Sequence, residues 1–217
     1  MTITENAKNL IEEVRRDFGD VLIVAASKMQ SIENIELAKL GGIEVFGENK
    51  VQEFIEKYGK TKCRWHFIGH LQTNKVKYLV GKVELIQSVD SKKLLDEIQK
   101  CASKLGIIQD VLLEINVGKE ESKSGVIPEE FDDLYAYANK LPNVRVRGIM
   151  SVMPKDCNEK LYLQLRQIYD KIENNNDNIS FLSCGMSGDY RLALKYGANV
   201  IRIGTKIFGK RDYSKEN

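Results

Sequence analysis

The sequence has almost no excess charge of either sign and no long apolar run. Its 33 lysines and arginines nearly balance 31 aspartates and glutamates, which leaves a formal net charge of +2. Nucleic-acid-binding domains usually carry a basic excess or a basic stripe, so we expect no nucleic-acid partner. The N-terminal segment MTITENAKNLIEEVRRDFG lacks the apolar core of a signal peptide, and no apolar run approaches a membrane span. These absences predict a cytoplasmic protein that is not bound to a membrane.

Cysteine and histidine are scarce. The four cysteines have no paired spacing and, without a signal peptide, are expected to be reduced thiols; they are Cys63, Cys101, Cys157 and Cys184. The two histidines, His66 and His70, have the i, i+4 spacing of a helical metal-binding pair. They fall on an expected strand and the loop after it, where this spacing does not form one face, so no metal site is predicted.

What the sequence does contain is a repeated alternation of short β-rich runs and helix-like stretches. The apolar fraction of 42% is ordinary for a globular protein and sufficient for a core. Several helix-like stretches begin with Ser or Asp and end at Gly, as helix caps prefer. Thr2 and Glu5 fit a capping box for an additional N-terminal helix, which Gly19 ends. The β-rich runs are VLIVAAS, IEVFG, WHFIG, VELIQSV, DVLLEINV, VRVRGIM, ISFLS and NVIRIG.

About eight such units within 217 residues predict an α/β protein, a single (β/α)8 TIM barrel with an extra N-terminal helix. No linker or low-complexity tract divides the chain, so residues 1–217 are expected to form one domain. A doubly wound open sheet, with helices on both faces, is the structural alternative that this pattern allows.

One cation directly follows the first β-rich run, and another lies within the last. Alternate side chains of a strand point to opposite faces, so Lys28 lies on the same face as Leu22. Arg202 is expected to point into the barrel, because Ile201 and Ile203 suit the face under the helices. Closure of the barrel places the eighth strand beside the first, which makes Lys28 and Arg202 predicted neighbours at the carboxyl end. Two adjacent cations need carboxylate partners or an anionic ligand, and the sequence leaves both alternatives open.

Other polar residues are also expected inside the barrel. Leu112, Glu114 and Asn116 share one face of VLLEINV, and Arg145 and Arg147 share one face of VRVRG. We predict that Glu114 and Arg147 form an ion pair across adjacent strands on the barrel floor.

Two loops suggest a phosphate site, because barrels of this class often bind phosphate with the loops after strands seven and eight. The loop CGMSGDYRLALKYG is Gly-rich, and Ser187 is placed to cap the helix that follows. After the last run, Gly204 allows the backbone to approach closely and Thr205 offers a hydroxyl group. Each loop alone is consistent with ordinary turn chemistry, but together they predict a site for a phosphate monoester. An inward lysine and arginine beside such a site suggest pyridoxal 5′-phosphate, which forms a Schiff base with a lysine amine.

The chain closely resembles the pyridoxal phosphate homeostasis proteins, whose fold is similar to the N-terminal barrel of alanine racemase. The resemblance covers nearly the whole sequence and rests on the motifs AASK, FGENKVQE, WHFIGHLQTNK, SVDS, SKSG, RGIMS, GMSGD and RIGTKIFGKR, in the family's order. It implies pyridoxal 5′-phosphate as the cofactor, Lys28 as the aldimine lysine and Arg202 opposite the pyridine nitrogen. The other cofactor-binding residues that it implies are Asn49, Ile68, Ser187, Gly204 and Thr205.

The resemblance implies a role in vitamin B6 homeostasis, in which the protein holds the cofactor and delivers it to apo-enzymes, with indirect effects on amino- and keto-acid metabolism. An arginine opposite the pyridine nitrogen opposes protonation of the ring, which weakens the ring as an electron sink. Alanine racemase adds a second domain with a tyrosine base, whereas this sequence ends at KRDYSKEN and Tyr213 is a poor substitute. We therefore expect a monomeric binding protein without turnover. A racemase or another lysine-Schiff-base barrel enzyme is the alternative.

Two basic segments keep alternative interpretations. Lys123, in the charged segment KEESKSGV, is either an ordinary solvated residue or a second amine used during cofactor transfer. The tail KIFGKRDYSK is either a solvated terminus or a docking surface for a partner.

Overall fold

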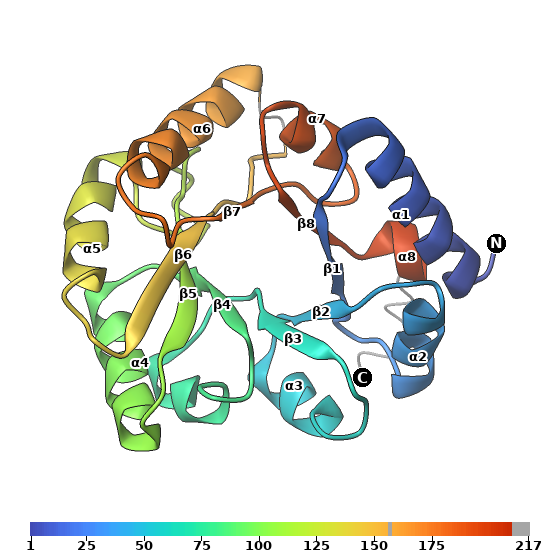
Figure 1. Cartoon of the computed structure of the whole chain (residues 1–217), viewed down its shortest axis with the longest axis horizontal. Coiled ribbons are helices and arrows are strands. Elements are labelled where there is room, and N and C mark those ends of the chain that lie inside the picture. Colours follow the sequence, from blue (N-terminus) through green and yellow to red (C-terminus); the bar gives the residue numbers. More distant parts are fainter. Residues whose placement is uncertain (156–157, 210–217) are drawn as a thin grey trace.

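The β-rich runs form the strands of one closed barrel. The structure is a computed structural model that describes residues 1–155 and 158–209, so Cys157, Tyr213 and the end of the basic tail lie outside the described residues. The strands are parallel and hydrogen-bonded in sequence order, and β8 pairs with β1 (Figure 1). This confirms the predicted (β/α)8 barrel and excludes the open sheet. The strands are β1 (Leu22–Ala26), β2 (Val45–Glu48), β3 (Arg64–Phe67), β4 (Leu85–Val89), β5 (Gln109–Glu114), β6 (Val144–Met150), β7 (Phe181–Ser183) and β8 (Val200–Ile203).

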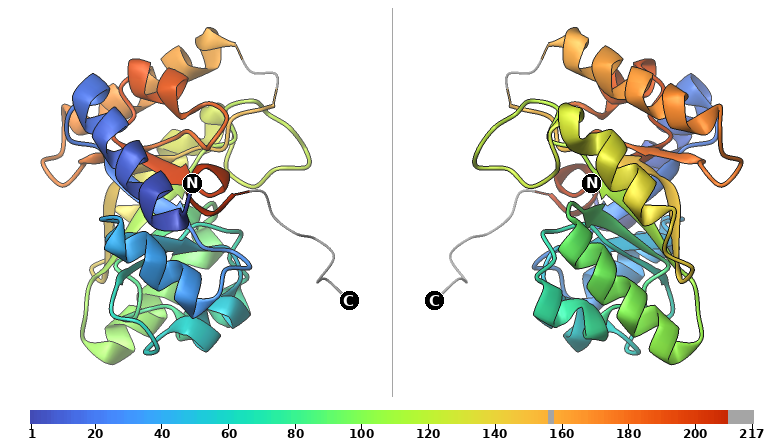
Figure 2. Two further views of the ribbon diagram at one scale, coloured as in Figure 1. Left: turned by 90° about the vertical axis from the view of Figure 1, so that its right-hand side faces the viewer. Right: turned by 90° about the vertical axis from the view of Figure 1, so that its left-hand side faces the viewer.

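The helices surround the barrel, as Figures 1 and 2 show. No helix within the described ranges combines the length and the apolar character needed to cross a bilayer. The α-helices are α1 (Ile3–Phe18), α2 (Ile32–Leu40), α3 (Val51–Lys57), α4 (Lys92–Leu105), α5 (Phe131–Ala138), α6 (Glu159–Glu173), α7 (Tyr190–Lys195) and α8 (Thr205–Phe208). Two 3-10 helices, η1 (Thr73–Tyr78) and η2 (Pro128–Glu130), complete the connections.

Short polar residues and glycines fix several helix ends. At the start of α1, the Thr2 hydroxyl accepts a hydrogen bond from Glu5 N at 3.2 Å, and the Glu5 carboxylate accepts one from Thr2 N at 2.8 Å. This is the predicted capping box, and Gly19 ends the helix with a φ of 78°. Helix α4 begins at the Ser91 hydroxyl, which accepts from Leu94 N, and ends at a left-handed glycine. The expected capping box and end of α1 are therefore confirmed, and α4 shows the general pattern of a helix that begins at Ser and ends at Gly.

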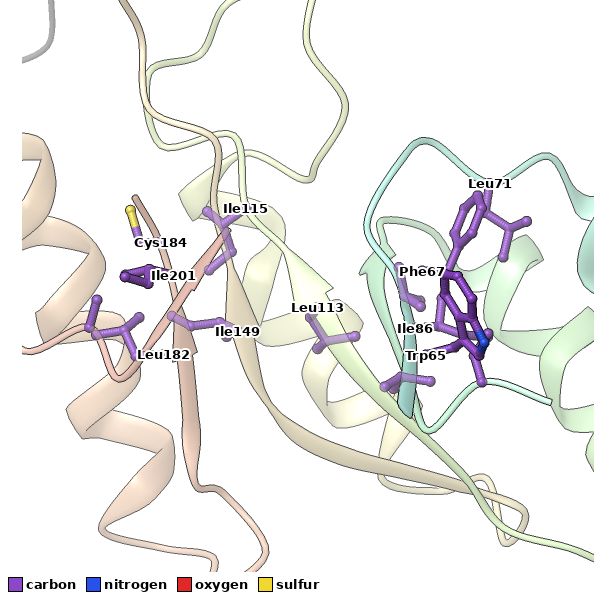
Figure 3. Packing of buried hydrophobic residues seen from close by; sticks show 14 of the residues in the cluster. Trp65, Phe67, Leu71, Ile86, Leu113, Ile115, Ile149, Leu182, Cys184 and Ile201 are labelled. Atoms are coloured by element: carbon purple, nitrogen blue, oxygen red, sulfur yellow. The ribbon is translucent and has the colours of Figure 1, made fainter. Parts of the chain in front are cut away.

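Each strand has an outer face under the helices and an inner face toward the barrel axis. The outer face forms the main hydrophobic core, and Figure 3 shows part of it, including Trp65, Leu113 and Ile149. Burial of one large aliphatic side chain of this kind stabilises a fold by about 1.5–3 kcal/mol. Ile201 and Ile203 belong to this outer core, as predicted. The inner face forms two smaller clusters: Val24, Val45, Ile68 and Val200 in one, and Leu85, Leu112 and Met150 in the other.

Candidate functional site

Lys28 follows β1 at the carboxyl end of the barrel. The alternate residues Leu22, Val24 and Ala26 belong to the inner cluster, so this face of β1 points inward as predicted. Lys28 is the next residue in the same alternation, and it is half-buried. It occupies the second position of a turn in which Gln30 N donates to the carbonyl of Ser27 at 3.0 Å. Strand β1 therefore passes directly into the turn that carries the Lys28 amine.

Arg202 lies on the neighbouring strand, deeper in the barrel. It is buried, with 4% of its surface exposed, and its backbone pairs with Val24 rather than with Lys28. A strand rises by about 3.3 Å per residue, so the four residues from Val24 to Lys28 separate the two backbones by up to roughly 13 Å along the strand. The predicted neighbouring strands are confirmed, but the two cations lie at different depths.

Neither cation is neutralised by the part of the chain that the structure describes. No carboxylate there lies within 4.0 Å of the Lys28 amine or the Arg202 guanidinium. Instead, Arg202 Nη1 donates to the Ser183 hydroxyl at 2.6 Å, and Nη2 donates to the carbonyl of Ser151 at 2.8 Å. Burial lowers the pKa of Arg202 below its ordinary value, with Cys184 opposing this shift most among the nearby groups. Of the two alternatives left open by the sequence, these contacts favour an anionic ligand over carboxylate partners.

The contacts of Arg202 continue across the barrel as a chain of hydrogen bonds. The Ser183 hydroxyl accepts from Arg202 and donates to Gln87 Oε1 at 2.6 Å. The other end of the Gln87 amide, Nε2, lies 2.9 Å from Nδ1 of His66. Burial, assisted by Arg64, lowers the pKa of His66 to about 3, so the imidazole is neutral and Nδ1 can accept. We call these four residues, Arg202, Ser183, Gln87 and His66, the Arg202 relay.

The predicted ion pair between Glu114 and Arg147 is wrong. In the pairing of β5 with β6, Glu114 lies opposite Met150, three residues further along β6 than Arg147. Arg147 Nη2 instead donates to Ser180 Oγ at 2.9 Å, and Nη1 lies 3.8 Å from Asp110 Oδ2. The alternation of residues gives the face on which a side chain lies but not the stagger between neighbouring strands, and this stagger places Glu114 nearer the carboxyl end than Arg147.

Glu114 therefore stands inside the barrel without the expected cation. Its Oε2 is buried and accepts no hydrogen bond from the described residues. The pKa of Glu114 is raised to about 7, mainly by burial and also by Asp90, while Arg202 opposes the shift. Asn116, the next residue on that face, donates through Nδ2 to the carbonyl of Glu120 at 2.8 Å. This bond holds the loop after β5, drawn in yellow-green in Figure 2, to the end of the strand.

The predicted phosphate residues meet, although not by the predicted contact. Ser187 does not cap α7, because Asp189 occupies the N-cap position and its carboxylate accepts from Met186 N at 2.7 Å. The Ser187 hydroxyl instead accepts from Gly204 N at 3.3 Å, which joins the loop after β7 to the loop after β8. Thr205 follows Gly204 directly and is exposed. The two loops thus form one polar surface at the carboxyl end of the barrel.

Asn49 and Ile68 complete the arc of sequence-predicted residues. Asn49 is half-buried and directly follows β2. The backbone of Gly69 passes so close that a Cβ there would lie 2.3 Å from Asn49 O. Ile68 is buried in the inner cluster, and a Cβ on Gly47 would lie 2.8 Å from Ile68 Cδ1. These contacts bring Asn49 and Ile68 to the side of the barrel mouth next to Lys28.

Sequence reasoning missed two groups of residues near this site. The first is the remainder of the Arg202 relay, for which the signal was a polar residue on the inner alternation of VELIQSV and ISFLS. The second is an ion cluster behind Lys28 in which Glu48 and Lys57 are buried and Glu53 is half-buried. Its signal in the sequence was the i, i+4 spacing of Glu53 and Lys57. No group of three or more potential metal ligands gathers anywhere in residues 1–155 and 158–209.

Comparison with known proteins places this chain in a family. Residues 2–212 match the model of the alanine racemase N-terminal domain, which defines the class of barrel. The pyridoxal phosphate homeostasis protein of Aquifex aeolicus is 45% identical over 97% of this chain and 96% of its own. The chain therefore belongs to the pyridoxal phosphate homeostasis protein family.

Solved structures agree with this placement. PipY of Synechococcus elongatus, solved with PLP bound, is 30% identical, with a TM-score of 0.84 over 96% of this chain and all of PipY. Alanine racemase of Clostridium difficile is 18% identical, with a TM-score of 0.76. The match covers 98% of this chain but only 56% of that racemase. This likeness concerns the fold alone.

Proposed function

We propose that this protein binds pyridoxal 5′-phosphate through the Lys28 amine and serves vitamin B6 homeostasis. The observation that carries the proposal is the charge imbalance at the carboxyl end of the barrel, where Lys28 and buried Arg202 lack carboxylate partners among the described residues. A cofactor with a phosphate and a phenolic oxygen would supply the missing negative charge. When bound, it supplies an aldehyde that a lysine amine captures. The structure of the relative PipY with PLP bound supports this choice of ligand.

The residues of the site fit such a ligand by their chemistry. The apolar side chain of Ile68 suits an aromatic ring, and Asn49 offers an amide beside it. The Ser187 hydroxyl, the Gly204 backbone and the Thr205 hydroxyl suit a phosphate group at the joined loops. Because both Nη atoms of Arg202 are already hydrogen-bonded, its guanidinium has a fixed orientation.

Arg202 also favours a carrier over an enzyme. A guanidinium keeps its proton at any physiological pH, so it cannot lend that proton to a pyridine nitrogen, and its charge opposes protonation of that nitrogen. The Aquifex relative named as a homeostasis protein aligns over 96% of its length, whereas the racemase aligns over 56%. We therefore propose a monomeric, cytoplasmic, single-domain carrier over residues 1–217 that delivers the cofactor to apo-enzymes and does not turn over a substrate. The competing function is that of an amino-acid racemase.

A borohydride experiment tests the proposal. Purified protein loaded with pyridoxal 5′-phosphate is reduced with borohydride, digested and mapped by mass spectrometry. We expect the label on Lys28, loss of the label in Lys28→Ala, and an unchanged label in Lys60→Ala, a control at an exposed lysine. A label on another residue would refute the assignment of Lys28. Racemisation of any amino acid that Lys28→Ala abolishes would replace the carrier with an enzyme.

A further inference from the structure

Three charged residues, two of them buried and one half-buried, lie behind the turn that carries Lys28. Lys57, at the end of α3, is 7% exposed, and Glu48, at the end of β2, is fully buried. The Lys57 amine lies 2.7 Å from Glu48 Oε1 and 3.3 Å from Glu53 Oε2. Burying charges is costly even when they are paired, so stability alone is a weak reason for such a cluster. We call these three residues the Lys57 cluster.

The Lys57 cluster contacts both residues that flank Lys28. The Lys57 amine donates to the carbonyl of Ser27 at 2.8 Å, and the Ser27 hydroxyl donates to Glu48 Oε1 at 2.6 Å. On the other side, Met29 N donates to Glu53 Oε2 at 2.6 Å. Ser27 is thus fixed on the outer face of the barrel, and the alternation of the chain directs the next side chain, Lys28, to the inner face.

The backbone of this turn needs external support. Met29 has a φ of 62°, in the left-handed region that side chains other than glycine rarely adopt. It is the third residue of the turn closed by Gln30 N and Ser27 O, a position where a type II turn favours glycine. Unfavourable backbone conformations persist where the surrounding structure enforces them, and they concentrate at functional sites. The hydrogen bond from Met29 N to Glu53 supplies that enforcement here.

We propose that Glu48, Glu53 and Lys57 are positioning residues that hold the Ser27–Gln30 turn so that the Lys28 amine points into the barrel. The inference deepens the proposed function and rests on it. The cluster lies on the outer side of β1 and β2, so it acts through the backbone of Ser27 and Met29 and not by contact with the ligand.

Substitutions at Glu53 separate a positioning role from a merely structural one. Loss of the carboxylate in Glu53→Ala should weaken the affinity for pyridoxal 5′-phosphate by about tenfold, as a turn conformation of this cost implies. Glu53→Gln keeps an oxygen that accepts from Met29 N, so its affinity should stay within about twofold of the wild type. Glu56→Ala, at an exposed position of the same helix, is the matched control and should bind as the wild type does.

A second substitution tests the mechanism directly. Glycine adopts a positive φ without steric cost, so in the background of Met29→Gly the Glu53→Ala change should weaken binding by less than about threefold. Amide hydrogen exchange of ligand-free protein gives a readout without the cofactor, in which Met29 N should exchange about tenfold faster in Glu53→Ala than in Glu56→Ala. Wild-type affinity in Glu53→Ala, or an equal loss in both backgrounds, would overturn the inference.

The two proposals fail in different ways. If borohydride does not label Lys28 in the wild type, the proposed function falls, and the positioning role falls with it. If the wild type is labelled at Lys28 while Glu53→Ala neither loses affinity nor exposes the Met29 amide, the positioning role alone is wrong. If Glu53→Ala does not fold, two other measurements test the positioning role. One compares the affinity of Glu53→Gln with that of Glu56→Ala, and the other measures the affinity of the single variant Met29→Gly. Glu53→Gln should then match the control, and Met29→Gly should bind no more weakly than about twofold below the wild type.

Discussion

The Arg202 relay makes a strict prediction about one proton. Arg202 and its neighbour Ser183 leave Gln87 only one consistent orientation, in which Oε1 accepts from the serine and Nε2 donates to His66. The histidine must then accept through Nδ1 and carry its proton on Nε2. Replacement of Gln87 by glutamate removes the donor but keeps the acceptor for Ser183. In Gln87→Glu, His66 can satisfy the new carboxylate only by carrying a proton on Nδ1.

The size of the effect follows from what each substitution leaves unpaired. Gln87→Met has a similar shape but neither accepts nor donates, so the Ser183 hydroxyl and His66 Nδ1 each lose a buried partner. An unsatisfied buried group costs about 1–3 kcal/mol, so two such groups predict a loss of about 2–6 kcal/mol in the free energy of unfolding. Gln87→Glu should lose less, because one bond survives and Arg202 is nearby. The carboxylate should also raise the pKa of His66 above its value of about 3.

Two measurements check this prediction. Nitrogen NMR of ligand-free protein should show the Nε2–H tautomer of His66 in the wild type, without protonation down to about pH 4. The same signal should change to Nδ1–H, or to the imidazolium, in Gln87→Glu. Urea unfolding should show a lower midpoint with an unchanged m-value in Gln87→Met. A wild-type His66 with its proton on Nδ1, or one that titrates near its ordinary pKa, would refute the relay.

Two further substitutions test the interior of the barrel. Gly47→Ala should lower the free energy of unfolding, measured by urea titration, by about 1–3 kcal/mol. The reason is that the new Cβ would lie 2.8 Å from Ile68 and 2.9 Å from Val24. An unchanged urea midpoint would contradict this packing. Glu114, with a pKa raised to about 7, holds its proton more tightly in the folded state, so wild-type stability should fall as the pH rises from about 4.5 through 7. Glu114→Gln should lack this decline and exceed the wild type by up to about 3 kcal/mol above pH 7, and parallel pH profiles of the two proteins would show that Glu114 is not perturbed.

The barrel could be predicted from the sequence because its signals are local. A short β-rich run marks each strand, and the capping residues Thr2 and Glu5 mark the start of α1. The inner face of β1 and the outer face of β8 follow from strict alternation, which both strands keep. Because closure of the barrel is a property of the whole fold, these local signals also place the strands of Lys28 and Arg202 side by side.

The remaining contacts of the site are not local, and that is why the sequence did not reveal them. Gln87 and Ser183 are 96 residues apart and meet only because the barrel encloses both. The stagger of β5 against β6, which separates Glu114 from Arg147, leaves no mark in the alternation of residues. For α7 the sequence offers two candidate N-cap residues, Ser187 and Asp189, and the helix begins after Asp189.

The cations at the two ends of the barrel differ in their carboxylate partners among the described residues. At the amino-terminal end, around a cavity of about 440 Å³, Arg64 lies 2.8 Å from Glu84 and Arg145 lies 2.6 Å from Asp110. At the carboxyl end, Lys28 and Arg202 have no such partner in the described part of the chain, although Glu114 lies nearby. The pKa of Glu114, raised to about 7 by burial, leaves that carboxyl partly protonated at neutral pH, so it is a poor counter-ion. Among the described residues, the cations of the carboxyl end therefore lack the partners that those of the amino-terminal end have, which favours an anionic ligand at the end where (β/α)8 barrels bind their ligands.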